Sequence, residues 1–253
     1  LNKTQGYPII ARGSGRSYGD NALAAYVLNT RFLDNFISLN TAKSTVTCGS
    51  GVQLKDMLNL VIPAGFFPPV LPGTKYVTVG GAIAADIHGK NHHQEGSFCQ
   101  HLVSFDLLLA NGEIIQCSRS KQEDLFRATC GGMGLTGVIL NATINLKKVA
   151  SVFINQKTRV ARNLSECMDI FDASEECEYS VAWLDAQAQG EHRGRSLIHT
   201  GNHSKKGDCQ PVLRREQYIP LIASSKLLNR YSIKLFNELL YQSKVIRRKS
   251  KQV

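Results

Sequence analysis

The sequence predicts a folded protein of mixed strands and helices, in two parts that meet near Ala150. Three features predict this class: segments of alternating polar and β-branched residues, short stretches with apolar residues at helical spacing, and glycine-rich turns between them. The chain has 253 residues, 43% of them apolar, which is enough to bury a substantial core. It contains no run of about 18 apolar residues and no basic-then-apolar leader after Leu1, so we expect neither a membrane span nor a signal peptide.

The first 150 residues carry most of the strand and turn signals. An alternating, β-branched segment predicts a half-buried strand at residues 44–48, and apolar runs on both sides of Asn111-Gly112 predict a hairpin over residues 103–117. The Ser-x-x-Glu pattern at residues 120–123 predicts a capping box that opens a helix, and a glycine cluster at residues 131–134 ends that helix. Further strands are expected at residues 7–11 and 137–146, and a further helix at residues 53–60.

Residues 151–253 differ from the first 150 residues in their pattern of predicted strands, helices and loops. We expect strands at residues 151–160 and 179–184, a helix at residues 163–171, and a polar, glycine-containing loop at residues 189–210. Residues 224–244 predict an amphipathic helix with a stripe formed by Leu228, Tyr231, Leu235 and Leu239. We favour docking of this helix on the core of its own domain. The alternative is that it lies on an anionic membrane surface, with Lys226, Arg230 and Lys234 on its other face.

The net charge of +10 arises in the last quarter of the chain. Residues 191–253 contain 14 Lys or Arg and 4 Asp or Glu, whereas the two kinds cancel in residues 1–190. This asymmetry suggests a partner that carries phosphate, and a solvated basic tail is the alternative. The seven cysteines are scattered without CxxC spacing, so we expect mostly buried free thiols in a reducing compartment, with no disulfide framework and no zinc site.

Three motifs have the composition of a binding site. The turn at residues 12–20 combines glycines with serine and arginine donors, so its N–H groups can surround an anion; an ordinary glycine turn is the alternative. Small residues at 71–85 allow close approach of a planar group, a pyrophosphate or another backbone. Residues 86–93 gather three histidines with a lysine, an aspartate and an asparagine. This cluster suits a hydroxylated or anionic substrate, and a metal site and a plain polar loop are the alternatives.

Together with Gly-Gly-Met-Gly-Leu-Thr-Gly at residues 131–137, these motifs resemble the PCMH-type FAD-binding domain of the vanillyl-alcohol-oxidase superfamily. The string Val-Gly-Gly-Ala-Ile-Ala-Ala-Asp-Ile-His-Gly-Lys-Asn-His-His at residues 79–93 is similar to the decaprenylphosphoryl-β-D-ribose 2-oxidase family in particular. The resemblance implies an α+β fold. Residues 1–150 would form a two-subdomain FAD-binding domain without its opening strand–helix unit, and residues 151–253 would form part of a sheet-and-helix substrate domain, incomplete at its C-terminus.

The resemblance also implies a role for individual residues. His88 and Lys90 would face the sugar as the catalytic residues, and Tyr18 and Trp183 would border the substrate pocket. Arg16 stands where covalent relatives place a flavin-linking histidine, so we expect non-covalent FAD, and no metal. The residues expected to contact FAD are Ala11, Arg12, Gly13, Ser14, Gly15, Arg16, Ser17, Tyr18, Gly19, Asp20, Asn21, Gly73, Thr74, Thr78, Val79, Gly80, Gly81, His88, Gly89, Lys90, Asn91, Gly134, Gly137 and Val138.

The implied reaction is FAD-dependent oxidation of the C2 hydroxyl of a polyprenyl-phosphoryl-β-D-ribose to the 2-keto sugar, with hydride transfer to flavin N5. Such a step belongs to the synthesis of an arabinose donor for the cell envelope. An aldonolactone or alditol oxidase acting on a soluble sugar is the alternative, and a non-catalytic polyanion-binding protein is a distant one. Expected partners are the sugar substrate, a partner reductase or epimerase, and a membrane surface touched by the basic C-terminal region, but not nucleic acid. We expect a cytoplasmic protein or one peripheral to the cytoplasmic membrane.

Overall fold

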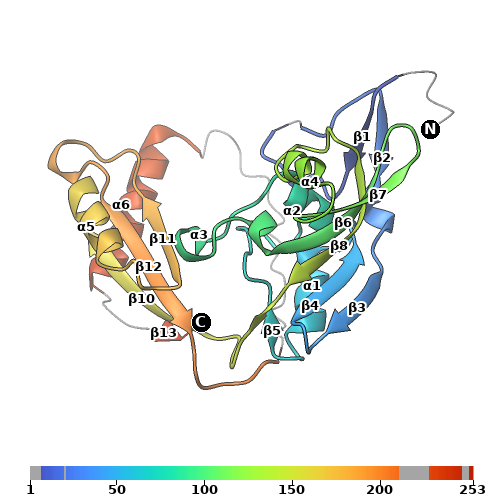
Figure 1. Cartoon of the computed structure of the whole chain (residues 1–253). Helices are drawn as coiled ribbons and strands as arrows, with labels where there is room; N and C mark the ends of the chain where they lie inside the picture. The colour runs from blue at the N-terminus through green and yellow to red at the C-terminus, as the bar shows by residue number, and fades with distance from the viewer. Residues whose placement is uncertain (1–6, 20, 211–227, 247–250, 253) are drawn as a thin grey trace. The chain divides into compact units, whose positions relative to one another are not determined.

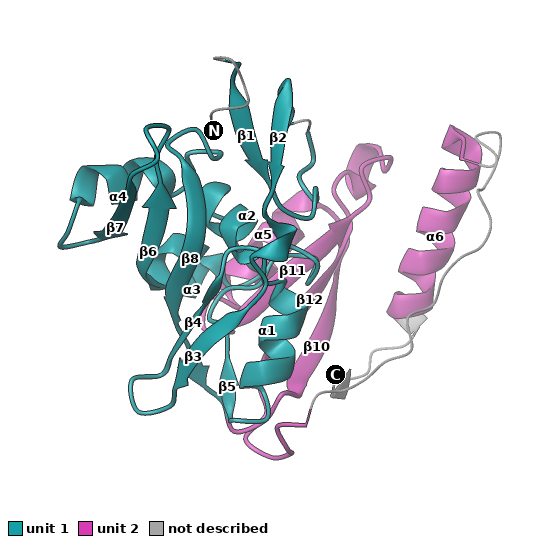
Figure 2. Ribbon diagram, turned by 90° about the vertical axis from the view of Figure 1, so that its right-hand side faces the viewer, with its two compact units in different colours: residues 1–149 teal, residues 150–253 magenta. Residues whose placement is uncertain are grey.

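The computed structural model describes residues 7–19, 21–210, 228–246 and 251–252 (Figure 1). The chain divides into two compact units, residues 1–149 and residues 150–253, which Figure 2 shows in different colours. Each unit has a mainly antiparallel sheet with helices packed against it, so the expected α+β class is confirmed. Among the described residues, no helix has both the length and the apolarity that crossing a bilayer requires.

The centre of unit 1 is a five-stranded antiparallel sheet. Its order is β3 (Phe36–Asn40), β4 (Thr45–Gly49), β8 (Val138–Asn145), β6 (Leu102–Leu108) and β7 (Ile114–Ser118). The expected strands at residues 44–48 and 137–146 and the hairpin over residues 103–117 are confirmed. Gly112 turns this hairpin with a φ of 88°, a conformation that residues with a side chain rarely adopt.

Helices packed around this sheet supply much of the core of unit 1. The buried residues of α1 (Leu54–Val61) include Leu54 and Met57, and α2 (Val79–Ala84) packs against β8. α4 (Glu123–Thr129) packs against β7, and its Phe126 stacks on Phe105 with ring centroids 5.3 Å apart. The remaining elements are the parallel pair β1 (Ile9–Arg12) and β2 (Tyr26–Asn29), the antiparallel pair β5 (Phe66–Phe67) and β9 (Lys147–Lys148), α3 (His92–Glu95), and the short 3-10 helices η1 (Thr30–Phe32) and η2 (Phe98–His101). β1 and α1 confirm the strand and the helix expected at residues 7–11 and 53–60.

Two local features of unit 1 differ from expectation. The capping box at residues 120–123 is wrong: α4 begins only at Glu123, its N-cap Gln122 makes no side-chain cap bond, and Ser120 Oγ lies 3.3 Å from Ser118 Oγ instead. α2 was not predicted, because six residues rich in glycine give no helical periodicity. It forms because Thr78 caps it, accepting a hydrogen bond from the N–H of Gly81 at 3.3 Å, and because its apolar side chains are buried.

Unit 2 is built on a sheet with the order β11 (Tyr179–Leu184), β12 (Ser196–His203), β10 (Ile154–Ala161) and β13 (Lys251–Gln252). β10 and β11 confirm two expected strands. The loop expected at residues 189–210 is wrong for β12, which pairs with β10 over its whole length and with β11 on its other side. The polarity of β12 misled the prediction, because its polar side chains find partners inside the protein. Ser196 Oγ donates to Gly194 O, just before the strand, at 2.7 Å, and His199 Nδ1 lies 2.9 Å from Thr158 Oγ1 on β10. The short η3 (Gly190–His192) precedes this strand.

α5 (Leu164–Asp172) covers part of one face of this sheet and confirms the helix expected at residues 163–171. Asn163 caps it by accepting a hydrogen bond from the N–H of Glu166 at 2.9 Å. Cys167 of this helix packs with Ala161 of β10 and Ile198 of β12, and these three buried residues form the small core of the unit. α5 therefore protects only one end of the sheet face.

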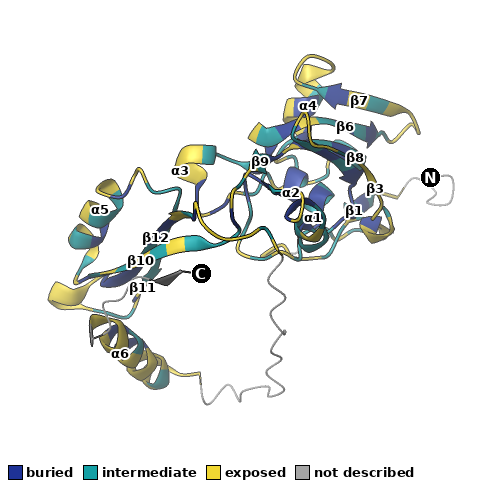
Figure 3. Cartoon of the chain, turned by 90° about the horizontal axis from the view of Figure 1, so that it is seen from below, coloured by how far each residue is buried: buried dark blue, intermediate teal, exposed yellow. Residues whose placement is uncertain are grey.

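α6 (Arg230–Ile246) docks on unit 2 through its polar side. Asn237 Nδ2 donates to Asp185 Oδ1 at 2.7 Å, and Tyr241 Oη donates to Ala161 O at 3.2 Å. The expected docking of this helix on its own domain is confirmed, but the contact is not made by the apolar stripe. Its members are exposed, and α6 is largely yellow in Figure 3: Leu228 is 67%, Tyr231 74%, Leu235 61% and Leu239 62% exposed. Residues 224–227 of the expected helix lie outside the described residues.

Candidate functional site

The glycine turn after β1 presents a row of unpaired backbone donors. Within the described part of the chain, no protein acceptor takes the N–H groups of residues 13–19, and Gly15 has a φ of +60°. Three cations surround the nearby ring of Tyr76: the Arg16 guanidinium at 5.7 Å, Lys55 Nζ at 5.9 Å and Lys75 Nζ at 5.5 Å from its centroid. Free N–H groups beside positive side chains are what an anionic ligand requires.

This turn packs closely against the start of α2. A Cβ added to Gly13 would overlap the hydroxyl of Thr78, so only glycine fits there. Gln53 Nε2 donates to Ser14 Oγ at 3.0 Å and fixes the turn on α1's N-terminal side. The turn and α2 are 60 residues apart in sequence, and the fold brings them into contact.

The first N–H groups of α2 are used inside the protein. Val79 N donates to Val52 O at 2.9 Å, Gly80 N to Ser50 O at 2.8 Å, and Gly81 N to Thr78 Oγ1 at 3.3 Å. Val79, Gly80 and Gly81 are among the residues expected to contact FAD, but their N–H groups are not available to a cofactor. Because Gly80 and Gly81 have no side chain, a cofactor could still approach the backbone of α2 closely at these two residues.

The glycine loop after α4, residues 131–137, packs against the C-terminal end of α2. Gly131 N donates to Ile83 O at 3.0 Å and Met133 N to Ala84 O at 2.8 Å, so the loop caps the helix's C-terminal carbonyl groups. A Cβ on Gly134 would lie 3.6 Å from Ile10 Cδ1, which places this loop beside β1. Three sequence motifs, at residues 12–19, 78–84 and 131–137, thus meet in one region of unit 1.

Buried polar atoms without partners remain in this region. Within the described residues, Ser50 Oγ, Gln53 Oε1 and Asn91 Oδ1 are buried and have no hydrogen-bond partner. Ser50 contacts Gly80, since a Cβ on that glycine would lie 3.0 Å from Ser50 Cβ, and Gln53 holds the glycine turn. Orphaned buried polar atoms are rare in proteins and indicate a missing partner, so this region fits a bound polar group. Sequence reasoning missed Ser50 and Gln53, although the Gly-Ser-Gly at residues 49–51 marks a tight turn there.

The segment after α2 holds two exposed, chemically active side chains on a fixed backbone. Asp86, at a φ of +39°, accepts a hydrogen bond from Cys99 N at 2.9 Å, and Asn91 Nδ2 donates to Pro69 O at 2.8 Å. Between these anchors Gly89 is buried, and a Cβ on it would lie 2.8 Å from Leu71 O. His88 and Lys90 flank this glycine, and both are exposed. The backbone of this segment is therefore held in place, while the side chains of His88 and Lys90 stay accessible.

The neighbouring histidines form no metal centre. His92 lies edge-on to His88 with ring centroids 5.8 Å apart, and His93 lies 6.1 Å from His92. In the part of the chain that the structure describes, no three His, Cys, Asp or Glu side chains are placed to hold a metal ion.

A thiol pair lies under the same segment and was not predicted. Cys99 Sγ lies 3.5 Å from Ile83 O, the same carbonyl that accepts from Gly131 N, and it also lies beside the thiol of Cys130. The single S–H of Cys99 donates to one of these two groups at a time. Donation to Cys130 lowers the pKa of that thiol, helped by the charge of Arg119 and opposed by burial and by Asp86. The same bond, together with burial, raises the pKa of Cys99. Cysteines 31 residues apart gave no sequence signal of this contact.

The other expected residues are placed as follows. Tyr18 is fully exposed in unit 1, and Trp183 is half-buried on β11 of unit 2. Val138 begins β8, and Gly137 has a φ of 155° with no room for a Cβ beside Leu108 O. Gly73 faces open space next to Thr74, and Asp20 lies outside the described residues.

Comparison with known proteins identifies the polar group that unit 1 fits. A family model described as an FAD-binding domain matches residues 1–118, which include the glycine turn, α2 and the His88–Lys90 segment. The chain is also 37% identical over 251 residues to the decaprenylphosphoryl-beta-D-ribose oxidase of Mycolicibacterium smegmatis, covering 94% of this chain and 55% of that protein. The chain contains an FAD-binding domain. The donors of the glycine turn and the orphaned polar atoms near α2 suit FAD, a dinucleotide with a pyrophosphate.

Other relatives match less of the chain. An uncharacterized Streptomyces coelicolor protein is 40% identical over 177 residues, covering 70% of this chain and 47% of that protein. Bovine L-gulonolactone oxidase is 28% identical over 174 residues, covering 68% of this chain and 39% of the oxidase. The chain thus spans about half the length, or less, of the curated relatives it matches.

Proposed function

We propose that this chain is the FAD-binding domain, residues 1–150, and part of the substrate domain, residues 151–253, of a sugar oxidase. The proposed reaction oxidises the C2 hydroxyl of a polyprenyl-phosphoryl-β-D-ribose to the 2-keto sugar. One observation carries the proposal: exposed His88 and Lys90 follow α2 directly on a pinned segment, in a chain 37% identical to a decaprenylphosphoryl-ribose oxidase.

FAD, when bound, supplies the redox chemistry by accepting a hydride from the carbon that bears the hydroxyl. The glycine turn at residues 12–19 would hold the pyrophosphate with its unpaired N–H groups. Ser50, Gln53 and Asn91 would satisfy further polar atoms of the cofactor. We assign non-covalent binding, because Arg16 carries no nucleophile that could link a flavin.

His88 and Lys90 would act on the substrate hydroxyl. Both side chains are exposed, and the hydrogen bonds of Asp86 and Asn91 fix the backbone between them. A fixed ammonium or imidazole can orient the hydroxyl and polarise its O–H bond while a base removes the proton. We assign positioning to both residues.

Anaerobic reduction of the bound flavin tests this function in the purified full-length gene product. We expect the flavin absorption to bleach on addition of a polyprenyl-phosphoryl ribose, and Lys90→Ala to slow bleaching by about 10²-fold or more without loss of FAD. Lys121→Ala removes an exposed lysine elsewhere in unit 1 and serves as the matched control. Unchanged bleaching in Lys90→Ala would remove Lys90 from the reaction.

A soluble-sugar oxidase is the second candidate, and the similarity to L-gulonolactone oxidase favours it. This candidate requires no lipid-linked substrate. Bleaching by a free aldonolactone or alditol, with no response to the polyprenyl-phosphoryl sugar, would establish this candidate in place of the first.

We also propose that α6 contacts an anionic membrane surface. Tyr231, Leu235 and Leu239 of α6 and Leu228 just before it are exposed, and residues 191–253 carry the whole charge excess. Apolar side chains beside basic ones are typical of helices that lie in a lipid interface. We expect co-sedimentation with vesicles of 30% phosphatidylglycerol that is weakened by Leu235→Gln; equal sedimentation of this variant would contradict the contact.

A further inference from the structure

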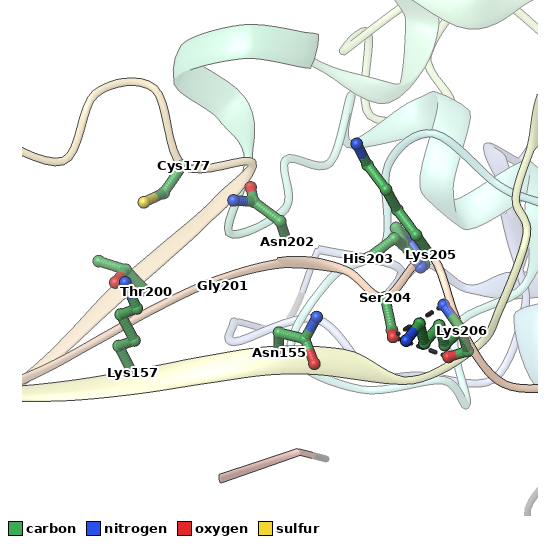
Figure 4. A pocket seen from close by; sticks show the side chains of 10 residues that line it. All are labelled: Asn155, Lys157, Cys177, Thr200, Gly201, Asn202, His203, Ser204, Lys205 and Lys206. Atoms are coloured by element: carbon green, nitrogen blue, oxygen red, sulfur yellow. Dashed lines mark hydrogen bonds between the residues drawn. The ribbon is translucent and has the colours of Figure 1, made fainter. Parts of the chain in front are cut away.

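Unit 2 contains a cavity on its sheet, and Figure 4 shows the side chains that line it. Its volume is about 590 Å³, and all of its lining residues belong to unit 2. Six of them set its chemical character: Asn155, Lys157, Thr200, Asn202, Lys205 and Lys206. A volume of this size is in the range of small-molecule sites.

The cavity exists because α5 covers only part of its sheet face. Asn155 pairs with Asn202 and Lys157 with Thr200 across β10 and β12, so these four side chains share one face. Ala161 and Ile198 lie on this same face further along, where α5 covers it. Beyond the helix, Asn155, Lys157 and Asn202 of this face are exposed, whereas Thr200 is buried.

Hydrogen bonds hold two turns of unit 2, and the second of these turns contributes residues to the lining. Arg159 Nη1 donates to Ser174 Oγ at 3.0 Å, and Ser174 Oγ donates to Ile170 O at 2.6 Å, which fixes the chain where it leaves α5. In the second turn, Ser204 Oγ donates to Lys206 O at 2.7 Å and accepts from Lys206 N at 3.2 Å. This second turn sets the backbone of Lys205 and Lys206.

The lining is rich in donors and contains no carboxylate. Three lysines, Lys157, Lys205 and Lys206, line the cavity, and Figure 4 shows that the Lys205 side chain extends away from Lys157. Asn202 Oδ1 accepts from Glu178 N at 2.7 Å, so the amide NH₂ is the part of that side chain left to donate. Thr200 adds a hydroxyl.

The described acidic side chains lie outside the lining, and that of Glu178 is next to one lining residue, His203. Glu178 Oε1 lies 3.7 Å from His203 Nε2. Asp208 Oδ1 accepts from Gln210 N at 3.4 Å, and the exposed Asp172, Glu175 and Glu176 after α5 do not line the cavity. The cavity therefore combines positive charge with hydrogen-bond donors, which is the pattern that binds an oxyanion with several acceptor oxygens.

We propose that this cavity is a binding site for a phosphate-type oxyanion: a pyrophosphate, or a phosphate ester with its attached group. The site lies wholly in unit 2 and uses no residue of the glycine turn. It goes beyond the proposed oxidation, and its function does not require the proposed sugar substrate.

Calorimetric titration of the FAD-saturated protein with inorganic pyrophosphate at low ionic strength tests this site. Saturating FAD keeps pyrophosphate from the glycine turn. We expect one saturable site, which Lys157→Gln weakens by about tenfold and Lys205→Gln/Lys206→Gln by more, since each lysine lost removes a charge-assisted hydrogen bond. Lys244→Gln on α6 removes the same charge from an exposed position of unit 2 and should leave the affinity within about twofold.

Two results would overturn the proposal: absence of saturable binding, or an equal loss of affinity in Lys157→Gln and Lys244→Gln. Trp183 emission and flavin absorption, measured on each variant, show that unit 2 is folded and that FAD is bound. Loss of pyrophosphate binding with intact flavin absorption is thereby distinguished from loss of FAD binding.

Vesicles distinguish the two sources of phosphate. If the site takes a lipid headgroup, pyrophosphate displaces the protein from phosphatidic-acid vesicles, and Lys157→Gln weakens vesicle binding. If it takes a soluble phosphate, pyrophosphate binds in calorimetry, and vesicle binding is the same in Lys157→Gln as in the unmodified protein. Both results support an oxyanion site and name its source.

Discussion

Arg195 joins α6 to the sheet of unit 2 through a buried ionic network, and replacing it with Met tests that network. Its Nε and Nη2 donate to Asp185 Oδ2 at 2.9 and 2.7 Å, and its Nη1 donates to Glu238 Oε2 at 2.7 Å. The guanidinium also lies over the ring of Tyr241, 4.8 Å from its centroid. Asp185 is 2% exposed and Arg195 8% exposed, so both charges are withdrawn from water.

The expected loss follows from what Arg195→Met leaves behind. The Asp185 carboxylate would remain buried with only the Asn237 amide and the Gln187 N–H as donors. Breaking a buried ion pair by removing one partner costs about 3–5 kcal/mol. With a urea m-value of about 1–3 kcal/mol/M, the unfolding midpoint of unit 2 falls by at least about 1 M.

Tryptophan fluorescence is the assay, because Trp183 is the only tryptophan of the chain and lies two residues before Asp185. Arg193→Met is the matched control: Arg193 is exposed, and its loss should change the unfolding free energy by less than about 0.5 kcal/mol. A loss below about 1 kcal/mol in Arg195→Met, or equal losses in both variants, would refute the argument that this network holds α6.

Three further predictions concern the FAD site, the thiols and pH. Gly13→Ala should weaken FAD binding by about tenfold or more, measured by flavin fluorescence titration, because the added Cβ overlaps the Thr78 hydroxyl; Thr78→Ala in the same chain should restore part of the affinity, and no rescue would contradict this cause. Brief iodoacetamide treatment should label Cys130 before Cys99, because the pKa of Cys130 is lowered and Cys99 is 5% exposed; mass spectrometry that finds Cys99 labelled first would reject this order. Burial opposes ionisation of Asp185, but hydrogen bonds led by that of Arg195 outweigh it and hold the pKa of Asp185 below its ordinary value. The stability that its carboxylate contributes is therefore present above about pH 4 and lost as the pH falls through the folded-state pKa, so the unfolding free energies of the unmodified protein and Asp185→Asn should converge in acid; a constant difference would contradict this assignment.

The parts of the fold that could be predicted are those whose signal is local. β4 alternates along its length, and Asn111-Gly112 dictates the turn between β6 and β7, so both follow from the sequence. β12 could not be predicted, because its polar residues become acceptable only between β10 and β11, and pairing of this kind leaves no local pattern. The apolar stripe of α6 did not predict which face of the helix docks, for a similar reason. The network of Asp185, Arg195 and Asn237 that docks the helix joins residues up to 52 positions apart.

The residues of the candidate site also fall into those with a local sequence signal and those that only the fold brings together. The glycine turn and the His88–Lys90 segment are continuous in sequence, and their composition alone marks them. Ser50 and Gln53 become site residues only because the fold places them against Gly80 and Ser14. The sequence also does not reveal that the carbonyl groups of Val52 and Ser50 accept the first N–H groups of α2.

The visible absorption spectrum of the purified full-length gene product, before and after acid precipitation, tests the FAD site most directly. We expect a flavin spectrum in the native protein and release of the flavin into the acid supernatant, because the glycine turn holds the cofactor by hydrogen bonds and charge. A flavin retained in the pellet would contradict non-covalent binding. A colourless protein that also fails to take up added FAD would contradict the site itself.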